Sequence, residues 1–363
     1  MDRTRVLVVG GYGTVGTVLS EVLAHDPRVD LVVAGRDARK AGDLARSLHA
    51  EARTVDVLDE ATIPEALAGV RVVVNCWAGP FTGAPLHLPR MAAERGIDYL
   101  DVSGSYEWSE RLLTLRDAAE RGGATLITAL GANPGIPGIA VMDAKHEVQS
   151  LESARILFVM GSKIDGISLA GLKELRHMFE VKPQCYREGQ WRAPEEEGMR
   201  EHVGAPFDKE VYMGVFVTRD LLTLPELTGL RELSAWSGSQ STLQGLAMVG
   251  GIWIGMTQHD GSARFLLRML KRMGERKGNI SDALIKVEVV GEAEGARVKR
   301  TVEMYCDENY ATAIAPALVC QQVIEGQIQR KGVFFGTEVV PARDFMRRLG
   351  GYALHLTKTV VPA

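Results

Sequence analysis

The sequence predicts an α/β fold in which a doubly wound parallel sheet is followed by a second α+β domain built on a largely antiparallel sheet. Strand and helix patterns alternate from residue 5 to about residue 132, which is typical of repeated βα units and a parallel sheet. Beyond that point, the alternating segment 283–291 is joined by the turn Glu294-Gly295 to a partner at 297–305. This pattern predicts an antiparallel hairpin.

The first βα unit carries a dinucleotide-binding motif. Residues 5–10 contain a short apolar run, which predicts a strand that is buried on both faces. The following turn has the G-x-G-x-x-G spacing of a Rossmann domain, in which the glycines allow a tight turn, close backbone approach to a pyrophosphate and close packing of the next helix. That helix would cover residues 17–25. The predicted cofactor-binding residues of this turn are Gly11, Gly13, Thr14, Val15 and Gly16.

The second strand, at 31–34, ends at Gly35-Arg36-Asp37, where an NAD enzyme usually carries a carboxylate. The glycine removes the group that would repel a 2′-phosphate, and Arg36 offers a planar cation to bind it. The sequence therefore predicts NADP(H) over NAD(H). The alternative is that Arg36 is a solvated loop residue and Asp37 binds the ribose.

The next elements continue the same alternation. A helix at 39–48 leads to a strand at 52–57, whose Asp56 is expected beside the adenine or in a surface loop. A helix at 63–67 precedes the strand 70–75. Loops at strand carboxyl ends line the cofactor crevice of such sheets, so the cofactor-binding candidates here are Asn75, Cys76, Ala78 and Gly79.

Two more strands, at 99–104 and 124–129, complete six parallel strands, with helices at 85–95 and 110–121. Prolines and glycines then cluster in the segment 131–137, which predicts a crossing between domains. In the second domain a strand is expected at 154–159, a helix at 169–179 and a further strand at 212–217. The expected boundaries are 1–132, 133–310 and 311–363, the last being C-terminal helices that return to the first domain.

Composition narrows the class of protein. The chain has 363 residues and a net charge of only −4, so nothing indicates a nucleic-acid partner. The four cysteines are widely spaced and suggest neither a disulfide framework nor a zinc site. The sequence passes from Arg5 directly into a strand without a long apolar segment, which favours the cytoplasm. Motifs of serine hydrolases, zinc proteases and P-loop kinases are absent from it.

A stretch without charged residues, 233–259, is followed by a basic run at 264–277. Glycine, serine and glutamine dilute the first stretch, so a buried helix or a contact between subunits, as in a homodimer, is favoured over a membrane span. The basic run could rest on an anionic membrane surface or accept an acidic substrate. A solvated helix with one face in the core is the preferred interpretation.

Polar residues near strand ends are the candidates for chemistry. Asp101 and Ser103 lie at or just past the carboxyl end of a strand of the first domain and are predicted to anchor a substrate, although Asp101 could cap a turn. Lys163 follows a strand of the second domain and is the next candidate for a catalytic residue. Tyr106 is a further candidate of the first domain. The other candidates of the second domain are His177, Lys182 and Tyr186, and for each second-domain residue a surface position is favoured over a catalytic one.

The order and spacing of five motifs resemble the saccharopine dehydrogenase-like family of NADP-dependent oxidoreductases. The motifs are GGYGTVG, AGRD, VVVNCWAGPF, DYLDVSGS and GANPGIPG, and the tail 312–349 resembles the closing elements of that family. The resemblance implies hydride transfer at a carbon–nitrogen bond, with the substrate between the two domains. Some relatives are similar to trans-acting enoyl reductases, notably in the segment 166–191, so reduction of a carbon–carbon double bond is the alternative, and a non-catalytic NADP(H)-binding protein is another.

Overall fold

The computed structural model describes residues 3–77, 79, 81–164, 167, 169–178, 182–276, 278–352 and 355–363. The chain divides into two compact units, one formed by Met1–Ile136 with Asn309–Pro341 and the other by Pro137–Glu308 with Ala342–Ala363. The expected return of 311–363 to the first domain is therefore corrected, because only the part up to Pro341 belongs there. Residues 342–363 belong to the second unit, where they end in a strand rather than a helix.

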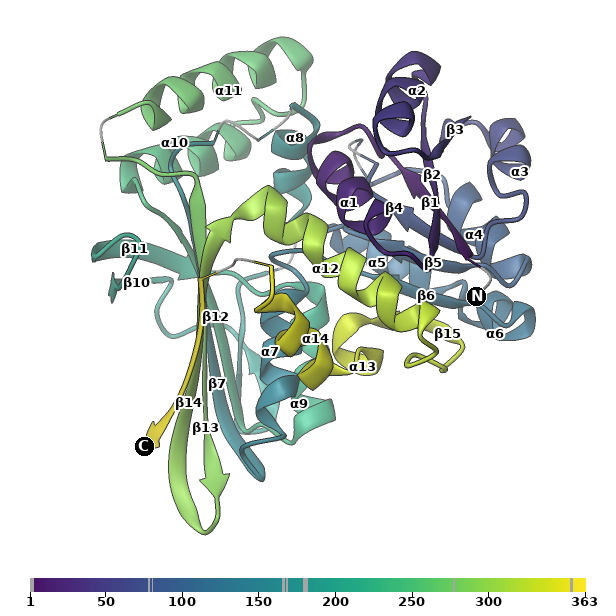
Figure 1. The fold of residues 1–363 in the computed structure, drawn as a ribbon. Coiled ribbons are helices and arrows are strands. Elements are labelled where there is room, and N and C mark those ends of the chain that lie inside the picture. Colours follow the sequence, from purple (N-terminus) through teal and green to yellow (C-terminus); the bar gives the residue numbers. More distant parts are fainter. Residues whose placement is uncertain are drawn as a thin grey trace. The chain divides into compact units, whose positions relative to one another are not determined.

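The first unit contains a parallel sheet with the strand order β15-β6-β5-β4-β1-β2-β3 (Figure 1). The order of β1 to β6 is that of a doubly wound dinucleotide-binding fold, so the predicted fold class is confirmed. The seventh strand, β15, pairs in parallel with β6 and was not predicted. The strands are β1 (Thr4–Val9), β2 (Val29–Gly35), β3 (Glu51–Thr54), β4 (Val72–Asn75), β5 (Asp98–Asp101), β6 (Thr125–Thr128) and β15 (Gly332–Phe335).

Helices complete the first unit. The central strands are almost completely buried, as expected for a sheet covered on both faces. Helix α12 runs through this unit from its second residue onward, and the Thr312 hydroxyl accepts a hydrogen bond from the N–H of Ala132. The helices are α1 (Thr14–Ala24), α2 (Ala38–Ser47), α3 (Ile63–Ala66), α4 (His87–Glu94), α5 (Tyr106–Leu113), α6 (Arg116–Gly122), α12 (Glu308–Ile324) and α13 (Gly336–Val339), with a 3-10 turn at Glu60–Thr62.

The second unit is built on a sheet with the order β10-β11-β12-β7-β13-β14-β16, and a short hairpin of β8 and β9 joins it at β12. Only β7 and β12 are parallel among these neighbours, so the prediction of a largely antiparallel sheet is confirmed. The strands are β7 (Ser150–Met160), β8 (Cys185–Arg187), β9 (Gln190–Arg192), β10 (Gly198–Val203), β11 (Lys209–Val215), β12 (Glu232–Ser239), β13 (Asp282–Ala293), β14 (Ala296–Asp307) and β16 (His355–Pro362).

The long hairpin of β13 and β14 turns at Glu294 and Gly295, both of which have positive φ, as the predicted turn requires. At one end of this unit, α8, α10 and α11 enclose a separate apolar core rich in methionine. The helices of the unit are α7 (Ile136–Ala144), α8 (Leu169–Met178), α9 (Leu224–Thr228), α10 (Thr242–Trp253), α11 (Asp260–Gly274) and α14 (Ala342–Leu349), with a 3-10 turn at Arg219–Thr223.

The uncharged stretch 233–259 forms β12 and α10, and the basic run that follows forms α11. Across the described ranges, no helix combines the length and the apolar character that crossing a bilayer would need.

Candidate functional site

The glycine-rich turn between β1 and α1 brings backbone segments into direct contact. Gly10 has a φ of +73°, and a Cβ atom at this position would lie 2.6 Å from the carbonyl oxygen of Cys76. A Cβ at Gly16 would lie 2.1 Å from the carbonyl oxygen of Gly10. Only glycine fits either position without moving backbone atoms. Gly11, Gly13 and Gly16 were predicted from the sequence, whereas Gly10 was not, although the Gly10-Gly11 pair was a visible signal.

The amino end of α1 is open to an anion. Its N-cap residue is Gly13, and no side chain caps the helix. The N–H groups of Thr14, Val15 and Gly16 lie in the first turn, where a helix provides no acceptor of its own. Backbone donors and the helix dipole together suit a phosphate group. The turn and helix end therefore fit the pyrophosphate of a dinucleotide, which would be held by these N–H groups.

The end of β2 leaves no room for a carboxylate at the usual ribose-binding position. A Cβ at Gly35 would lie 2.5 Å from the ring of Tyr12, so this ring covers the glycine. The Tyr12 hydroxyl also accepts a hydrogen bond of 2.9 Å from the N–H of Asp37. Tyr12 thus joins the glycine-rich turn to the loop after β2, a role that the sequence analysis did not assign.

Arg36 and Asp37 differ in their availability for a ligand. The Asp37 carboxylate accepts hydrogen bonds from the N–H groups of Arg39 and Lys40 and thereby caps α2, and these bonds lower its pKa. Arg36 is exposed, and its side chain has no hydrogen-bond or ion-pair partner within the described ranges. A free guanidinium at this position suits a 2′-phosphate. Its role in binding the cofactor stays a prediction.

Asp56 lies two residues beyond the end of β3, in a loop rather than in the strand. Its carboxylate accepts a hydrogen bond of 3.0 Å from the N–H of Leu58, and its own N–H donates to the Thr62 hydroxyl. The side chain therefore stabilises the loop that leads to α3. A contact with the adenine stays a prediction.

Four of the predicted cofactor residues lie at the end of β4 and in the sequence that follows it. Asn75 is buried, donates a hydrogen bond of 2.9 Å to the Tyr99 hydroxyl and accepts one from the N–H of Trp77. Burial, together with the charge of Asp101, raises the pKa of the Cys76 thiol to about 12, so this cysteine is a neutral packing group. A Cβ at Gly79 would clash with the Trp77 indole. Ala78 lies outside the described residues.

Asp101 is the centre of a buried hydrogen-bond network at the carboxyl end of β5. It is completely buried, and it accepts hydrogen bonds from the Trp108 indole at 2.8 Å and the Thr128 hydroxyl at 2.7 Å. Burial raises its pKa, while these hydrogen bonds act in the opposite direction. The N–H of Ser103 also donates to it. The geometry gives Asp101 a positioning role for the loops after β5 and β6.

Ser103 is buried as well, and its hydroxyl accepts a hydrogen bond from the N–H of Ser105, which caps α5. Neither Asp101 nor Ser103 presents its side chain at the surface of the first unit. Direct contact of either residue with a substrate stays a prediction. The structure brings both together with Asn75, because β4 pairs with β5 at the register Asn75–Asp101.

The candidates of the second domain do not form one cluster. Lys163 is exposed just after β7, where its N–H donates to the carbonyl of Ile280. Lys182 is exposed in the segment before β8, and Tyr186 lies in β8 with its ring against Trp191. His177 lies in α8, and its side chain is outside the described set. A catalytic role for Lys163 stays a prediction.

Glu308 is a titratable group that the sequence analysis missed. It is the first residue of α12, where the chain passes from the second unit to the first. Burial raises its pKa to about 7, and the adjacent Asp307 adds to the effect. No motif marks Glu308 in the sequence, because burial, the larger cause of its raised pKa, is not visible in a sequence pattern.

We expect the Glu308→Gln variant to show a pH dependence of stability that differs from the wild type. The carboxyl binds its proton more tightly when folded, so the wild type should lose stability as the pH rises from about 4.5 to about 7. The loss should be at most about 3 kcal/mol. Urea unfolding from pH 4 to 8 measures it, and a parallel slope in wild type and variant would contradict the assignment.

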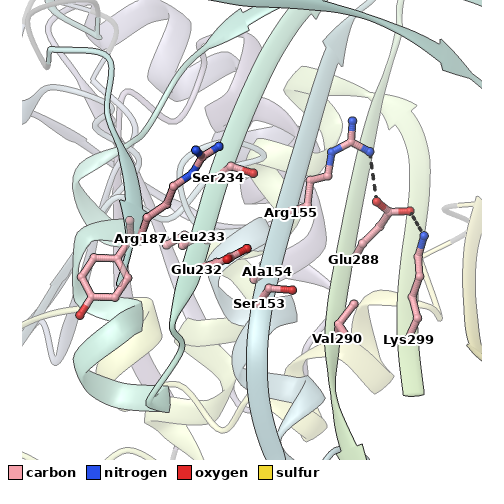
Figure 2. Close-up of a pocket in the computed structure, with 11 residues that line it drawn as sticks. Ser153, Ala154, Arg155, Arg187, Glu232, Leu233, Ser234, Glu288, Val290 and Lys299 are labelled. Atoms are coloured by element: carbon pink, nitrogen blue, oxygen red, sulfur yellow. Dashed lines mark hydrogen bonds and ion pairs between the residues drawn. The ribbon is translucent and has the colours of Figure 1, made fainter. Parts of the chain in front are cut away.

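The sheet face of the second unit carries a separate pocket of about 230 Å³. Figure 2 shows Arg155 and Lys299 pointing toward Glu288, which lies between them. Arg155 also pairs with Glu201 at 2.8 Å. These charges neutralise one another inside the pocket, and Tyr186 is the one predicted candidate that lines it. The charged side chains of this pocket are therefore explained by ion pairs within the sheet, without a ligand.

Comparisons with known proteins find relatives of the first unit. Residues 6–127 match the family model of the saccharopine dehydrogenase NADP binding domain. A probable mitochondrial saccharopine dehydrogenase-like oxidoreductase of Arabidopsis thaliana is 28% identical over 145 residues, which cover 35% of this chain and 31% of the relative. The chain thus matches about a third of the length of that relative.

The fold of the whole chain also has a solved counterpart. The apo saccharopine dehydrogenase (L-Glu forming) of Saccharomyces cerevisiae aligns with a TM-score of 0.72, covering 99% of this chain and 100% of that one, at 15% sequence identity. This likeness extends the predicted resemblance in fold to both units. The family match confirms NADP as the predicted cofactor, because residues 6–127 are similar to the NADP-binding domain of saccharopine dehydrogenase.

Proposed function

We propose that the chain is an NADP(H)-dependent oxidoreductase that transfers hydride at a carbon–nitrogen bond. In the reductive direction an imine, formed from a carbonyl compound and an amine, would receive hydride at carbon and a proton at nitrogen. The observation that carries the proposal is the NADP-binding domain in a chain whose fold matches saccharopine dehydrogenase over 99% of its length. The oxidation of an amine would be the same reaction in reverse.

The cofactor and the protein would carry out different parts of this reaction. Bound NADPH supplies the hydride, so the protein has to bind and orient it and to handle one proton. The first-turn N–H groups of α1 and the exposed Arg36 would bind the phosphates. The buried Asp101 would hold the loops after β5 and β6 in place. This last role is one of positioning, not of contact with the substrate.

Glu308 and Lys163 are the proposed groups for the proton. A general acid or base works best when its pKa lies near the working pH, and that of Glu308 is raised to about 7. Lys163 is exposed and could reach an acidic substrate instead. If Glu308 moves the proton, Glu308→Gln should remove the limb of the kcat/KM profile near pH 7, whereas Lys163→Met should leave that limb in place.

The experiment that tests the reaction class is a substrate screen with purified protein. Oxidation of NADPH is followed with amine–carbonyl pairs and, separately, with enoyl thioesters. We expect turnover with at least one amine–carbonyl pair that contains an amino acid, and much weaker turnover in the Arg36→Ala variant, which controls for contaminating reductases. Turnover with enoyl thioesters alone would replace carbon–nitrogen with carbon–carbon chemistry.

Tight NADPH binding without turnover on either class would favour the third possibility, a cofactor-binding protein that is not an enzyme. The cytoplasm remains the proposed location, and a homodimer the proposed assembly.

A further inference from the structure

The second unit has a concentrated apolar surface on one pair of helices. Of the nine large apolar side chains that are clearly exposed in the described part of the chain, five lie between residues 243 and 265. They are Leu243, Leu246, Trp253, Ile254 and Phe265, with exposed fractions from 58% to 81%. Exposed apolar groups gathered in this way mark a surface that binds something. We call these five residues the apolar patch.

The patch lies on the outer faces of α10 and α11. Figure 1 shows the two helices side by side at one end of the second unit. Their inner faces pack together, and a Cβ at Gly251 of α10 would lie 2.7 Å from the Leu266 side chain of α11. Leu243, Leu246 and Trp253 recur at a spacing of three and seven residues, so they share the opposite face of α10. Phe265 is the neighbour of Leu266 in α11, and Ile254 directly follows the last residue of α10.

Basic residues accompany the patch on the outer face of α11. Arg264, Arg268 and Arg272 recur every four residues and are exposed. Arg264 pairs with Asp260 at 3.5 Å, whereas Arg268 and Arg272 have no ion-pair partner among the described residues. Residues 240–276 contain five Arg or Lys and two Asp or Glu, although the whole chain has a net charge of −4. The positive charge is thus local to this surface.

We propose that α10 and α11 form a docking surface for a membrane that contains anionic phospholipids. Exposed apolar side chains would enter the boundary between headgroups and acyl chains, and the arginines would contact the headgroup phosphates. A tryptophan that is 81% exposed suits this interface, where its ring is partly apolar and partly polar. The surface lies in the second unit, and the inference is independent of the proposed reaction.

The charges favour a membrane over a second copy of the chain. In a two-fold contact the same surface meets itself, so Arg268 and Arg272 would be brought together with the arginines of the same helix in the second copy. Of the two acidic residues in 240–276, Asp260 already pairs with Lys173 and Arg264, which leaves one carboxylate, Glu275, for Arg268 and Arg272. Anionic headgroups provide the missing negative charge along all the arginines on the outer face of α11.

Flotation of the full-length protein with vesicles tests the proposal. We expect binding to vesicles of phosphatidylcholine with about 30% phosphatidylglycerol, weak binding to phosphatidylcholine alone, and a loss of binding at high salt. Arg268→Gln with Arg272→Gln should reduce the partition coefficient about twenty-five-fold, because each cation near the surface contributes about fivefold. Trp253→Ser with Phe265→Ser should reduce it at least about tenfold.

Matched controls separate this surface from general charge and hydrophobicity. Val360→Ser with Val361→Ser removes exposed apolar groups from β16, and Arg46→Gln with Arg200→Gln removes two exposed cations elsewhere. Both control pairs should bind vesicles as the wild type does. All variants must retain the wild-type unfolding temperature and NADPH affinity, which shows that they are folded.

Two results would overturn the proposal. One is equal or absent binding to both kinds of vesicle in the wild type. The other is a dimer that the Trp253→Ser/Phe265→Ser variant converts to a monomer without any effect of vesicles, because a second copy of the chain would then cover the patch. Light scattering at each protein concentration used for flotation distinguishes these cases.

Discussion

Replacing Arg36 with alanine should weaken NADPH binding about ten- to hundredfold and leave NADH binding within about twofold of the wild type. The side chain is exposed at the end of β2 and has no partner in the described part of the chain, so its guanidinium is available to a 2′-phosphate. Charge-assisted hydrogen bonds of this kind are stronger than neutral ones. NADH lacks the phosphate and should not sense the change.

Titration of purified protein with NADPH and then NADH, followed by nucleotide fluorescence, measures both affinities. Arg39→Ala is the matched control, because Arg39 is an exposed arginine three residues away on α2. Arg36→Lys should fall between wild type and Arg36→Ala, since lysine keeps the charge but loses the planar fork. A ratio of the two affinities that is unchanged in Arg36→Ala would leave NADP selectivity to other residues, and Asp37 would become the candidate for the ribose.

The first unit was predictable because its signals are local. Each central strand is a short apolar run, and the glycine spacing before α1 reflects backbone contacts within a few residues. The strand that was not predicted, β15, has a clear apolar run at Val333-Phe334-Phe335. Its partner β6 lies about 200 residues earlier, however, and no local pattern states that pairing.

The second unit was harder to predict because its sheet depends on pairing between distant segments. Strand β12 carries serine and glycine, and β10 has three consecutive polar residues, Arg200-Glu201-His202, so neither stands out. Strand β16 pairs with β14 at the edge of the sheet, and most of its residues are exposed. A single sequence cannot separate such an edge strand from a solvated tail.

The site was predictable in position but not in the direction of its side chains. Asn75 and Asp101 were both placed at strand carboxyl ends, where they do lie, with a register that makes them neighbours. Their polar atoms turn inward, however, toward Tyr99, Trp108 and Thr128. The same residue types at the same strand ends could have faced a ligand, because the loop conformation decides and the pattern does not contain it.

The second unit should depend strongly on one buried cation. Arg300 of β14 is almost completely buried, pairs with the equally buried Asp143 of α7, and donates to Glu147 at 2.5 Å. Lys358 of β16 also contacts Asp143, at 2.9 Å. Removing one partner of a buried ion pair leaves an uncompensated charge, which typically costs about 3 to 5 kcal/mol. Since Lys358 remains beside Asp143, we expect Arg300→Met to cost about 3 kcal/mol.

Hydrogen–deuterium exchange of the β13 and β14 amides measures this loss within the second unit, where a global unfolding curve would mix both units. Arg297→Met is the matched control: it removes a largely exposed arginine of the same strand, which pairs with Glu152 at 3.0 Å, and it should cost less than about 1 kcal/mol. Adding Asp143→Leu to Arg300→Met should recover part of the loss, because the uncompensated carboxylate is then gone. Equal protection in Arg300→Met and Arg297→Met would mean that apolar packing, rather than this network, joins α7 and β16 to the sheet.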